Sequence, residues 1–172
     1  MDPKDFRGEY ERMCMPLGMY ALRFVGNVDD AQDIVQGAFM AAWQRVIKGE
    51  DIQNFKAYMY RAVHNAAMAY LRQRQNISDV AYNELDEVKE VSEEAIDTAE
   101  RDAALWKAID SLPNRCREIF LMSKRDGMSN VAIAEELGIS VKTVENQMTK
   151  AFSALRGNPD LRLGKVFFLP FL

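Results

Sequence analysis

The side chains best suited to chemistry lie in one segment of the second half of the chain, DGMSNVAIAEELGISVKTVENQMTKAFSALR, residues 126–156. Its later part places lysine, threonine, asparagine and glutamate at spacings that share the outer surface of a helix. Asparagine pairs with adenine edges, glutamate accepts from cytosine, and lysine binds phosphates or guanine. The residues of this surface are Ser140, Lys142, Thr143, Glu145, Asn146 and Lys150. The chemistry that they indicate is the reading of duplex DNA through the major groove.

Two helices joined by a tight turn must position that surface. Ser129 can cap the first helix, Gly138 sits where the turn demands a positive φ, and Ser140 can cap the second helix. We expect the first helix to bury Val131, Ile133, Ala134 and Leu137, and the second to bury Val141, Val144, Met148, Phe152 and Leu155. The pattern predicts a helix-turn-helix; an ordinary helix pair with a glycine turn is the alternative.

A second group of candidates lies on a predicted helix from about Phe55 to Arg74. It combines aromatic and basic residues, namely Phe55, Tyr58, Tyr60, Arg61, Arg72 and Arg74. Such a mixture suits single-stranded DNA, through base stacking and attraction to the backbone. The alternative is that each aromatic residue belongs to the core. We expect the apolar face of this helix to carry Tyr58, Ala62, Ala66, Ala69 and Tyr70.

Composition argues against several other kinds of site. The chain of 172 residues has one histidine, His64, so a histidine-based metal site or catalytic triad has little material. No phosphate-binding glycine loop, dinucleotide fingerprint or hydrolase nucleophile motif occurs. We expect no enzyme activity, no cofactor and no metal. Cys14 and Cys116 are read as reduced thiols of a cytoplasmic protein.

The net charge of −4 is unevenly distributed along the chain. Residues 1–76 carry a net charge of +1, residues 77–102 carry −8, and residues 103–172 carry +3. The middle segment also lacks large apolar residues that could anchor a core. We therefore predict an acidic linker at residues 77–102, with a solvated acidic helix as the close alternative.

Helical periodicity dominates the chain, and strand patterns are nearly absent. We predict an all-α fold of two small domains, residues 1–76 and 103–160, joined by the acidic linker and followed by an apolar tail, residues 161–172. Pro16 and Gly18 are expected to break or bend the first helix. Asp29 or Asp30 is expected to cap the second, which runs to about Val46. No segment has the apolar length of a membrane span.

Three segments, in this order, resemble the extracytoplasmic-function (ECF) sigma factors of bacterial RNA polymerase. They are DAQDIVQGAFMAAW, AYMYRAVHNAAMAYLRQR and AIDSLPNRCREIFLMSKRDGMSNVAIAEELGISVKTVENQMTKAFSALR. The first two are similar to sigma domain two, and the third to sigma domain four. The resemblance covers nearly the whole chain except the linker and the last dozen residues.

The resemblance implies roles for individual residues in domain two. One helix would dock the coiled coil of the polymerase β′ subunit, through Asp33, Ile34, Val35, Gln36 and Met40. The loop Lys48–Asn54 and the helix after it would capture a flipped base of the melted −10 element. The implied −10 contacts are Lys48, Asn54, Lys56, Tyr58, Arg61, Asn65, Arg72 and Arg74.

Domain four would read the −35 element as duplex DNA with the helix-turn-helix surface and contact the β flap. The linker would thread toward the RNA path of the polymerase, where its carboxylates could mimic a nucleic-acid strand. Two positions depart from the family pattern: Glu145 stands where many members have a basic residue, and Gly37 replaces a common glutamate. The −35 sequence therefore cannot be transferred to this chain.

The sequence thus predicts a sigma factor that acts in the cytoplasm without direct membrane insertion. Its expected partners are core RNA polymerase (the β′ and β subunits), promoter DNA and an anti-sigma factor. Two alternatives stay open. A stand-alone helix-turn-helix regulator would bind duplex DNA tightly by itself, which the mild charge argues against. An all-helical interaction protein would show no DNA-dependent activity with polymerase.

Overall fold

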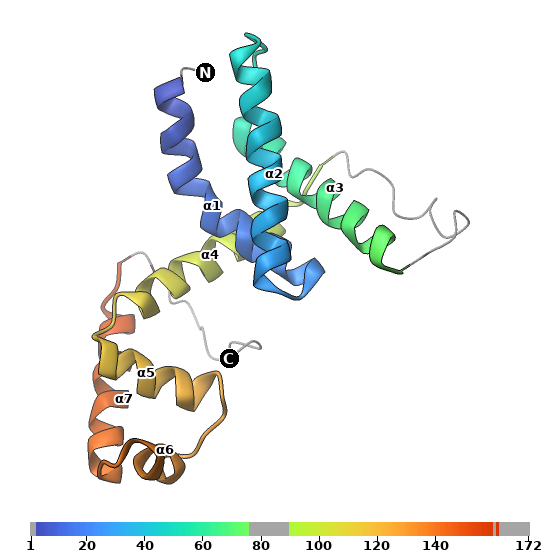
Figure 1. Ribbon diagram of the computed structural model, residues 1–172. Coiled ribbons are helices and arrows are strands. Elements are labelled where there is room, and N and C mark those ends of the chain that lie inside the picture. The colour runs from blue at the N-terminus through green and yellow to red at the C-terminus, as the bar shows by residue number, and fades with distance from the viewer. Residues whose placement is uncertain (1–2, 76–89, 160, 162–172) are drawn as a thin grey trace. The chain divides into compact units, whose positions relative to one another are not determined.

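The computed structural model describes residues 3–75, 90–159 and 161, and every regular element in these ranges is an α-helix (Figure 1). The helices are α1 (Pro3–Val25), α2 (Val28–Ile47), α3 (Phe55–Gln75), α4 (Glu93–Asp110), α5 (Asn114–Lys124), α6 (Asn130–Leu137) and α7 (Val141–Arg156). The predicted all-α fold class is confirmed. None of these described helices combines the length and hydropathy that a bilayer crossing requires.

The chain divides into two compact units, residues 1–103 and residues 104–172. The first holds α1, α2, α3 and residues 93–103 of α4, and the second holds the rest of α4 with α5, α6 and α7. The described part of the predicted linker, residues 90–102, therefore belongs to the first unit and is helical from Glu93 onward. The other linker residues, and the apolar tail after Leu161, lie outside the described residues.

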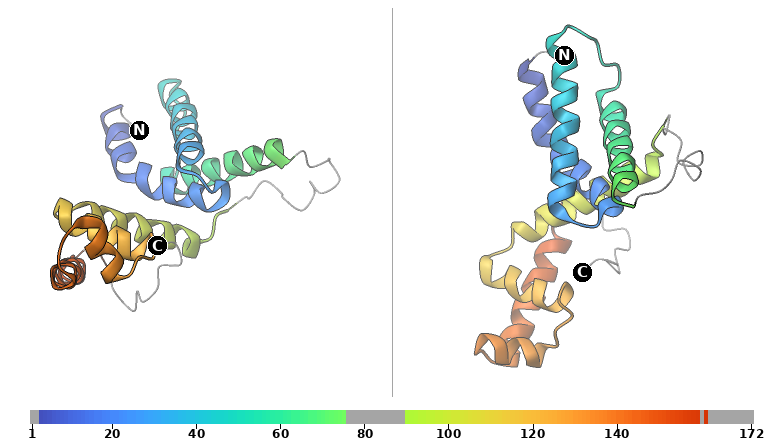
Figure 2. Two further views of the ribbon diagram at one scale, coloured as in Figure 1. Left: turned by 60° about the horizontal axis from the view of Figure 1, so that its bottom comes forward. Right: turned by 45° about the vertical axis from the view of Figure 1, so that its right-hand side comes forward.

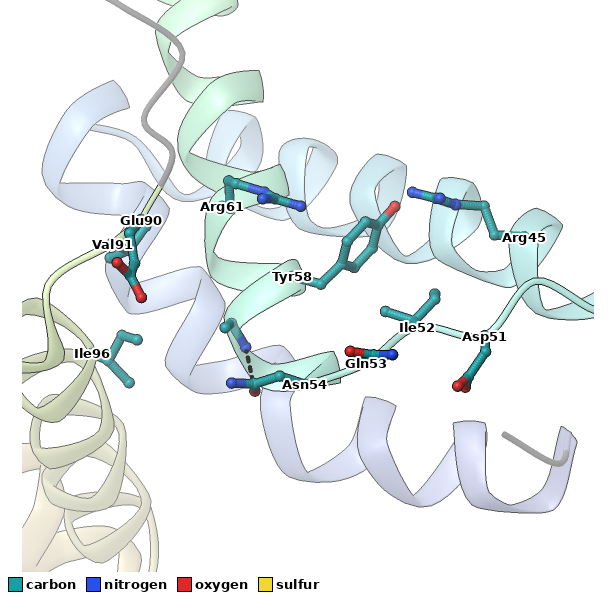
Figure 3. A pocket seen from close by; sticks show the side chains of 11 residues that line it. Arg45, Asp51, Ile52, Gln53, Asn54, Tyr58, Arg61, Glu90, Val91 and Ile96 are labelled. Atoms are coloured by element: carbon teal, nitrogen blue, oxygen red, sulfur yellow. Dashed lines mark hydrogen bonds between the residues drawn. The ribbon is translucent and has the colours of Figure 1, made fainter.

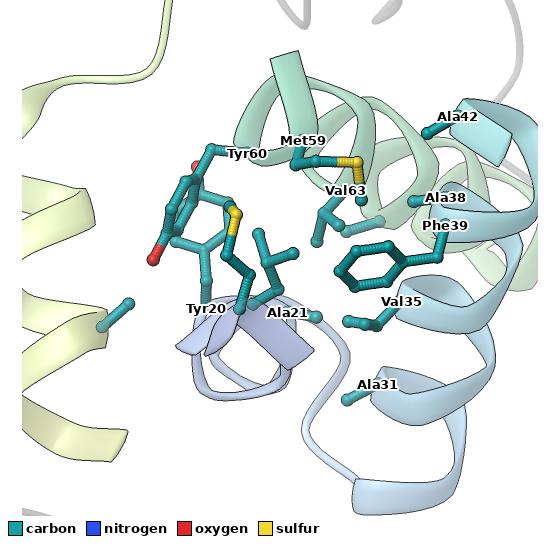
Figure 4. Close-up of a cluster of buried hydrophobic side chains, with 14 of the residues drawn as sticks. Tyr20, Ala21, Ala31, Val35, Ala38, Phe39, Ala42, Met59, Tyr60 and Val63 are labelled. Carbon is teal, nitrogen blue, oxygen red and sulfur yellow. The ribbon is translucent and has the colours of Figure 1, made fainter. Parts of the chain in front are cut away.

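Three long helices of the first unit pack around one hydrophobic core. α1 and α2 run side by side in opposite directions, and α3 contacts both (Figures 1 and 2). Figure 4 shows the centre of this core, where Met59 and Val63 of α3 face Phe39 of α2 and Ala21 of α1. Met59 and Val63 are fully buried, and each such side chain contributes about 1.5–3 kcal/mol relative to exposure. This packing fixes how α3 is rotated against its neighbours.

Local signals set the helix bounds in the first unit. α2 begins after Asn27, whose side chain accepts a hydrogen bond of 2.8 Å from the backbone N–H of Asp30. The N-cap is thus Asn27, whereas Asp29 or Asp30 was predicted. These two residues lie in the first turn of the helix, where a negative charge interacts favourably with the helix dipole. α1 continues through Pro16 as one helix, whose axis changes direction along its length (Figure 1). Of the two predicted effects of Pro16 and Gly18, a break or a bend, the structure shows a bend.

The buried face of α3 differs from the predicted one. Its buried residues are Phe55, Met59, Tyr60, Val63, Ala67 and Met68. Of the residues expected there, Ala69 is exposed and Tyr58 is only half-buried. The prediction counted Tyr58 as a core residue because it is aromatic, and successive helix positions are rotated by about 100°, so an error of one position turns the whole face. Tyr58 is therefore available to a site outside the core.

The second unit packs α5 against both α6 and α7. Ile119 of α5, Ile133 and Ala134 of α6, and Val144 of α7 are buried together in one cluster. The thiol of Cys116 donates a hydrogen bond of 3.3 Å to a backbone carbonyl of α7, and burial raises its pKa. Cys116 therefore packs as an interior residue between α5 and α7.

Candidate nucleic-acid interfaces

A pocket of about 320 Å³ opens in the first unit beside the connection between α2 and α3 (Figure 3). This volume falls in the range of about 300–1,000 Å³ that small-ligand sites occupy. Its wall is formed by the last turn of α2, the connecting loop, the first turns of α3, and the first turn of α4 with the residues just before it. The lining residues are Arg45, Asp51, Ile52, Gln53, Asn54, Ala57, Tyr58, Arg61, Glu90, Val91 and Ile96.

Two unusual backbone conformations shape the loop of this pocket. Gly49 has a φ of 77° and Asn54 a φ of 47°, a region that asparagine tolerates better than most residues. The side-chain oxygen of Asn54 accepts a hydrogen bond of 3.2 Å from the backbone N–H of Ala57 and so caps α3. Tyr58 and Arg61 are three residues apart on α3, so both project from the same side of the helix.

Cations flank the aromatic ring in the pocket. The guanidinium of Arg45 lies 5.3 Å from the centre of the Tyr58 ring, and its Nε donates a hydrogen bond of 2.6 Å to Glu50. Figure 3 shows Tyr58 between Arg45 and Arg61 along the pocket, and Arg61 is exposed. An aromatic face next to two guanidinium groups can stack a nucleobase and attract its phosphates.

The structure brings together three of the predicted −10 contacts, since Asn54, Tyr58 and Arg61 all line the pocket. Asn65 is half-buried and lies outside the lining, although it continues the stripe of Tyr58 and Arg61 at a spacing of four residues. Lys48 is exposed just after α2 and is also outside the lining.

The other predicted −10 contacts hold protein partners. The Nζ of Lys56 lies 2.6 Å from a carboxylate oxygen of Glu100. Arg74 donates a hydrogen bond of 2.6 Å to the hydroxyl of Tyr70 and lies 3.7 Å from Asp30. Hydrogen bonds from Asn27 and Tyr70, with the charge of Arg74, hold the pKa of the Asp30 carboxyl below its ordinary value. Arg72, near the same end of α3, is half-buried and also has contacts of its own.

Five residues of the pocket wall were not predicted, namely Arg45, Ala57, Glu90, Val91 and Ile96. Arg45 had one local signal, because it occupies the last turn of a predicted helix directly before the predicted loop. Glu90, Val91 and Ile96 had none, because they enter the pocket only through the packing of a segment that the sequence placed in a linker.

The predicted helix-turn-helix is present in the second unit. The side chains of Ser129 and Ser140 accept hydrogen bonds of 3.2 and 3.1 Å from backbone N–H groups three residues later, which caps α6 and α7 as predicted. Gly138 has the expected positive φ, 62°. The backbone N–H of Ile139 donates to the carbonyl of Ala134 at 2.9 Å, which closes a glycine-terminated helix end.

All six predicted −35 contacts are exposed. They are Ser140, the N-cap of α7, and Lys142, Thr143, Glu145, Asn146 and Lys150 of α7 itself. Lys142 pairs with Glu145 at 3.3 Å. Val131 and Val141, which were predicted to be buried, are 55% and 37% exposed. They lie in the first turns of α6 and α7. Exposed methyl groups can contact thymine methyls in a major groove.

Comparison with known proteins matches both units. Sigma-70 region 2 matches residues 17–77, and sigma-70 region 4 matches residues 102–155. "ECF RNA polymerase sigma factor SigW" of Bacillus subtilis is 26% identical over 145 residues, which cover 78% of each chain. The chain belongs to the ECF sigma factors. The resemblance stated from the sequence is confirmed.

Two further similar proteins extend the comparison of this sigma factor. "Probable RNA polymerase sigma factor RfaY" of Xanthomonas campestris pv. campestris is 29% identical over 143 residues, which cover 79% of this chain but 36% of that protein. Among solved structures, CnrH in complex with the cytosolic domain of CnrY aligns at 24% identity and a TM-score of 0.37. That alignment covers 90% of this chain and 87% of the other.

Region 2 of this sigma factor presents a second predicted surface on α2. Asp33 and Gln36 are exposed, Ile34 is half-buried, and the side chain of Met40 is 65% exposed. Val35 was predicted to contact polymerase with them, and this prediction is wrong. Its side chain is 4% exposed and belongs to the core of the unit, because it lies on the opposite side of α2.

The single histidine of this sigma factor lies at the edge of the core of region 2. The Nδ1 of His64 is 2.9 Å from the hydroxyl of Tyr20, and the ring of Phe24 packs edge-on at 5.2 Å. Burial lowers the pKa of His64, which favours the neutral imidazole. Among the described side chains, no group of three His, Cys, Asp or Glu residues is placed to hold a metal ion.

Proposed function

We propose that this sigma factor directs core RNA polymerase to promoters, where the first unit holds a melted −10 strand and the second reads the −35 element as duplex. The observation that carries the proposal is the pocket that Tyr58, Arg61 and Arg45 line beside the α2–α3 loop. The protein does no covalent chemistry in this scheme. It favours the open promoter because the pocket binds an unpaired base and does not bind a base that is still paired in the duplex.

Capture of a base fits the chemistry of the pocket. A base that leaves the duplex loses its stacking, and the ring of Tyr58 can replace that contact. Arg61 is exposed at the rim, where a phosphate of the same strand would lie. Asn65 stands further along the same stripe of α3, so we assign it to the strand after the captured base.

Reading of the −35 element fits the exposed surface of α7. The N-terminal residues of a recognition helix contact base edges, and here Ser140, Lys142 and Thr143 occupy the start of the helix. Asn146 and Lys150 continue the surface toward the adjacent phosphates. With only a few cations on this surface, the electrostatic part of the affinity stays small, so we expect weak binding by the isolated protein.

Docking on polymerase is assigned to the exposed part of the α2 surface, Asp33, Gln36 and Met40, with Ile34 at its edge. A methionine that is 65% exposed between polar neighbours suits a protein contact because its side chain adapts to the partner surface. From the family resemblance, we assign the β′ subunit to this surface and the β flap to the second unit. The same resemblance supports control by an anti-sigma factor and action in the cytoplasm.

Transcription with purified core polymerase tests the proposal. The protein and core polymerase are incubated with a library of random promoter sequences, and the transcribed templates are sequenced. We expect two enriched elements at a fixed spacing, and transcription only when both proteins are present. Asn65→Ala should reduce promoter opening more than polymerase binding.

Two other outcomes would favour the alternatives. Tight binding of the isolated protein to one palindromic duplex, without polymerase, would indicate a stand-alone regulator. Failure to associate with core polymerase at all would reject the proposed function.

A further inference from the structure

The first turns of α4, with the residues just before them, pack onto the core of the first unit. Ala99 is fully buried there, and Val91, Ala95 and Ile96 are partly buried against the same core as α1, α2 and α3. These residues fall in the predicted acidic linker, for which a solvated acidic helix was the alternative. Their spacing of three and four residues gives the segment one apolar side, which is the side that docks.

Two ion pairs add to this apolar contact. Glu100 lies 2.6 Å from Lys56 of α3, and Asp102 lies 2.7 Å from Arg23 of α1. Residues 90–103 carry six carboxylates and one arginine, so the segment is strongly anionic. Lys56 is not a lining residue, but it is the direct neighbour of the lining residue Ala57 on α3. A carboxylate of the segment thus neutralises a cation next to the lining part of α3.

The same segment forms one wall of the pocket. Glu90, Val91 and Ile96 line it, opposite the side chains of the α2–α3 loop and beside Arg61 (Figure 3). An anionic, partly apolar protein segment therefore forms one wall of the pocket, and the other walls carry an aromatic ring and two guanidinium groups.

We propose that residues 90–103 form a strap that competes with single-stranded DNA for this pocket within the same chain. The carboxylates of the strap pair with cations that would otherwise bind the phosphates of a DNA strand. The apolar side chains of the strap block the side of the pocket from which a base would approach. Entry of a strand then requires Lys56 to exchange Glu100 for a phosphate and residues 90–96 to leave the wall. The proposal rests on the proposed function, because it assumes that the pocket accepts a single strand.

The strap lowers the apparent affinity for a strand by the fraction of molecules in which it is undocked. Weakening the docking should therefore strengthen strand binding. Glu100→Lys replaces an ion pair with a repulsion. Partly exposed ion pairs contribute roughly 0.2–1 kcal/mol, so we expect about 1.4- to fivefold tighter binding.

The matched control is Asp97→Lys. Asp97 is exposed on the same helix, three residues before Glu100, and the substitution changes the net charge of the chain by the same amount. General attraction of a more basic protein to DNA affects both variants equally. Asp97 also belongs to the strap, but among the described residues its carboxylate forms no ion pair, so the two variants differ in the loss of the Glu100–Lys56 pair.

The experiment measures the fluorescence anisotropy of a short labelled single-stranded oligonucleotide of mixed sequence with the full chain, for the wild type and both variants at one salt concentration. Amide hydrogen exchange of residues 93–103 is followed with and without the same oligonucleotide. We expect Glu100→Lys to bind more tightly than Asp97→Lys, and saturating strand to accelerate exchange in the wild-type segment.

Equal binding by the two variants, with exchange of residues 93–103 unchanged by the strand, overturns the competition. If no form of the free protein binds the strand while transcription with core polymerase succeeds, the competition is equally refuted. If that transcription fails as well, the proposed function itself is wrong. Circular dichroism of both variants verifies that they are folded.

Discussion

Replacing Tyr58 tests the chemistry of the pocket most directly. The ring is half-buried on the pocket side of α3, and the guanidinium of Arg45 lies 5.3 Å from its centre. Tyr58→Ala removes the only aromatic surface among the lining residues while the capped start of α3 is left in place. The pocket should then attract a strand through Arg45 and Arg61 but no longer stack a base.

The size of the effect follows from the stacking energy. Stacking of one base on an aromatic side chain contributes about 1–3 kcal/mol, so the equilibrium for promoter opening should fall by about 5- to 150-fold. The assay forms holoenzyme with core polymerase and compares a fully paired promoter with one whose −10 region is permanently mismatched. Both templates should lose open complex, because a captured base is needed to hold either of them.

Two control substitutions isolate the ring. Tyr58→Phe keeps the stacking surface and should open promoters like the wild type. Tyr10→Ala deletes a 42% exposed tyrosine from α1, away from the pocket, and should not affect opening. Wild-type levels of open complex with Tyr58→Ala on both templates, in a protein that still binds core polymerase, would refute base stacking in this pocket.

Three further outcomes concern stability and the second unit. Gly138→Ala should lower the free energy of unfolding in urea by about 1 kcal/mol. No atom lies within 4 Å of an added Cβ, so the destabilisation comes from the backbone conformation, whose φ is 62°. The control Gly157→Ala, at a φ of −81°, should be nearly neutral. The imidazole of His64, the single histidine of the chain, should titrate below 6.5 in an NMR experiment. Since its pKa is lower in the folded state, the unfolded chain binds the proton first, and stability should fall as the pH drops below about 6.5; a titration at or above that value would contradict this. Lys142→Glu combined with Lys150→Glu should weaken the −35 footprint of the holoenzyme, and an unchanged footprint would remove these residues from the interface.

The sequence predicted most where the determinants are local. Ser129, Gly138 and Ser140 act on backbone groups within a few residues, so their roles follow from residue type and position alone. The faces of the same helices were harder to predict. Val131 and Val141 read as core residues, but whether a first-turn valine is buried depends on what lies beyond the turn, and here nothing in the described unit covers them.

The pocket shows the limit of such prediction more clearly. The loop before α3 and Tyr58 were identified, since a loop between two strong helical patterns is visible in the sequence. The wall that Glu90 and Ile96 provide was not predicted, because it depends on the packing of Ala99 into the same core as α3, although Ala99 lies more than twenty residues after the end of α3 along the chain. Alanine carries too little hydrophobic area for such docking to stand out in an acidic segment.

The pairing of surface cations bears on how a chain with a net charge of −4 could select DNA. Lys142 is paired with Glu145, Lys56 with Glu100, and Arg74 lies near Asp30, so several cations assigned to DNA already have carboxylate partners. Each exchange of a carboxylate for a phosphate gains little, since one ion pair replaces another. Neither unit should therefore hold DNA firmly by itself, and selectivity should arise when polymerase presents both units to one promoter, so that binding by the first raises the effective concentration of the second. On this reasoning, a strap that blocks the −10 pocket in the free protein reduces the promoter affinity of the holoenzyme only a little, because core polymerase and the −35 surface of the second unit supply the remaining affinity.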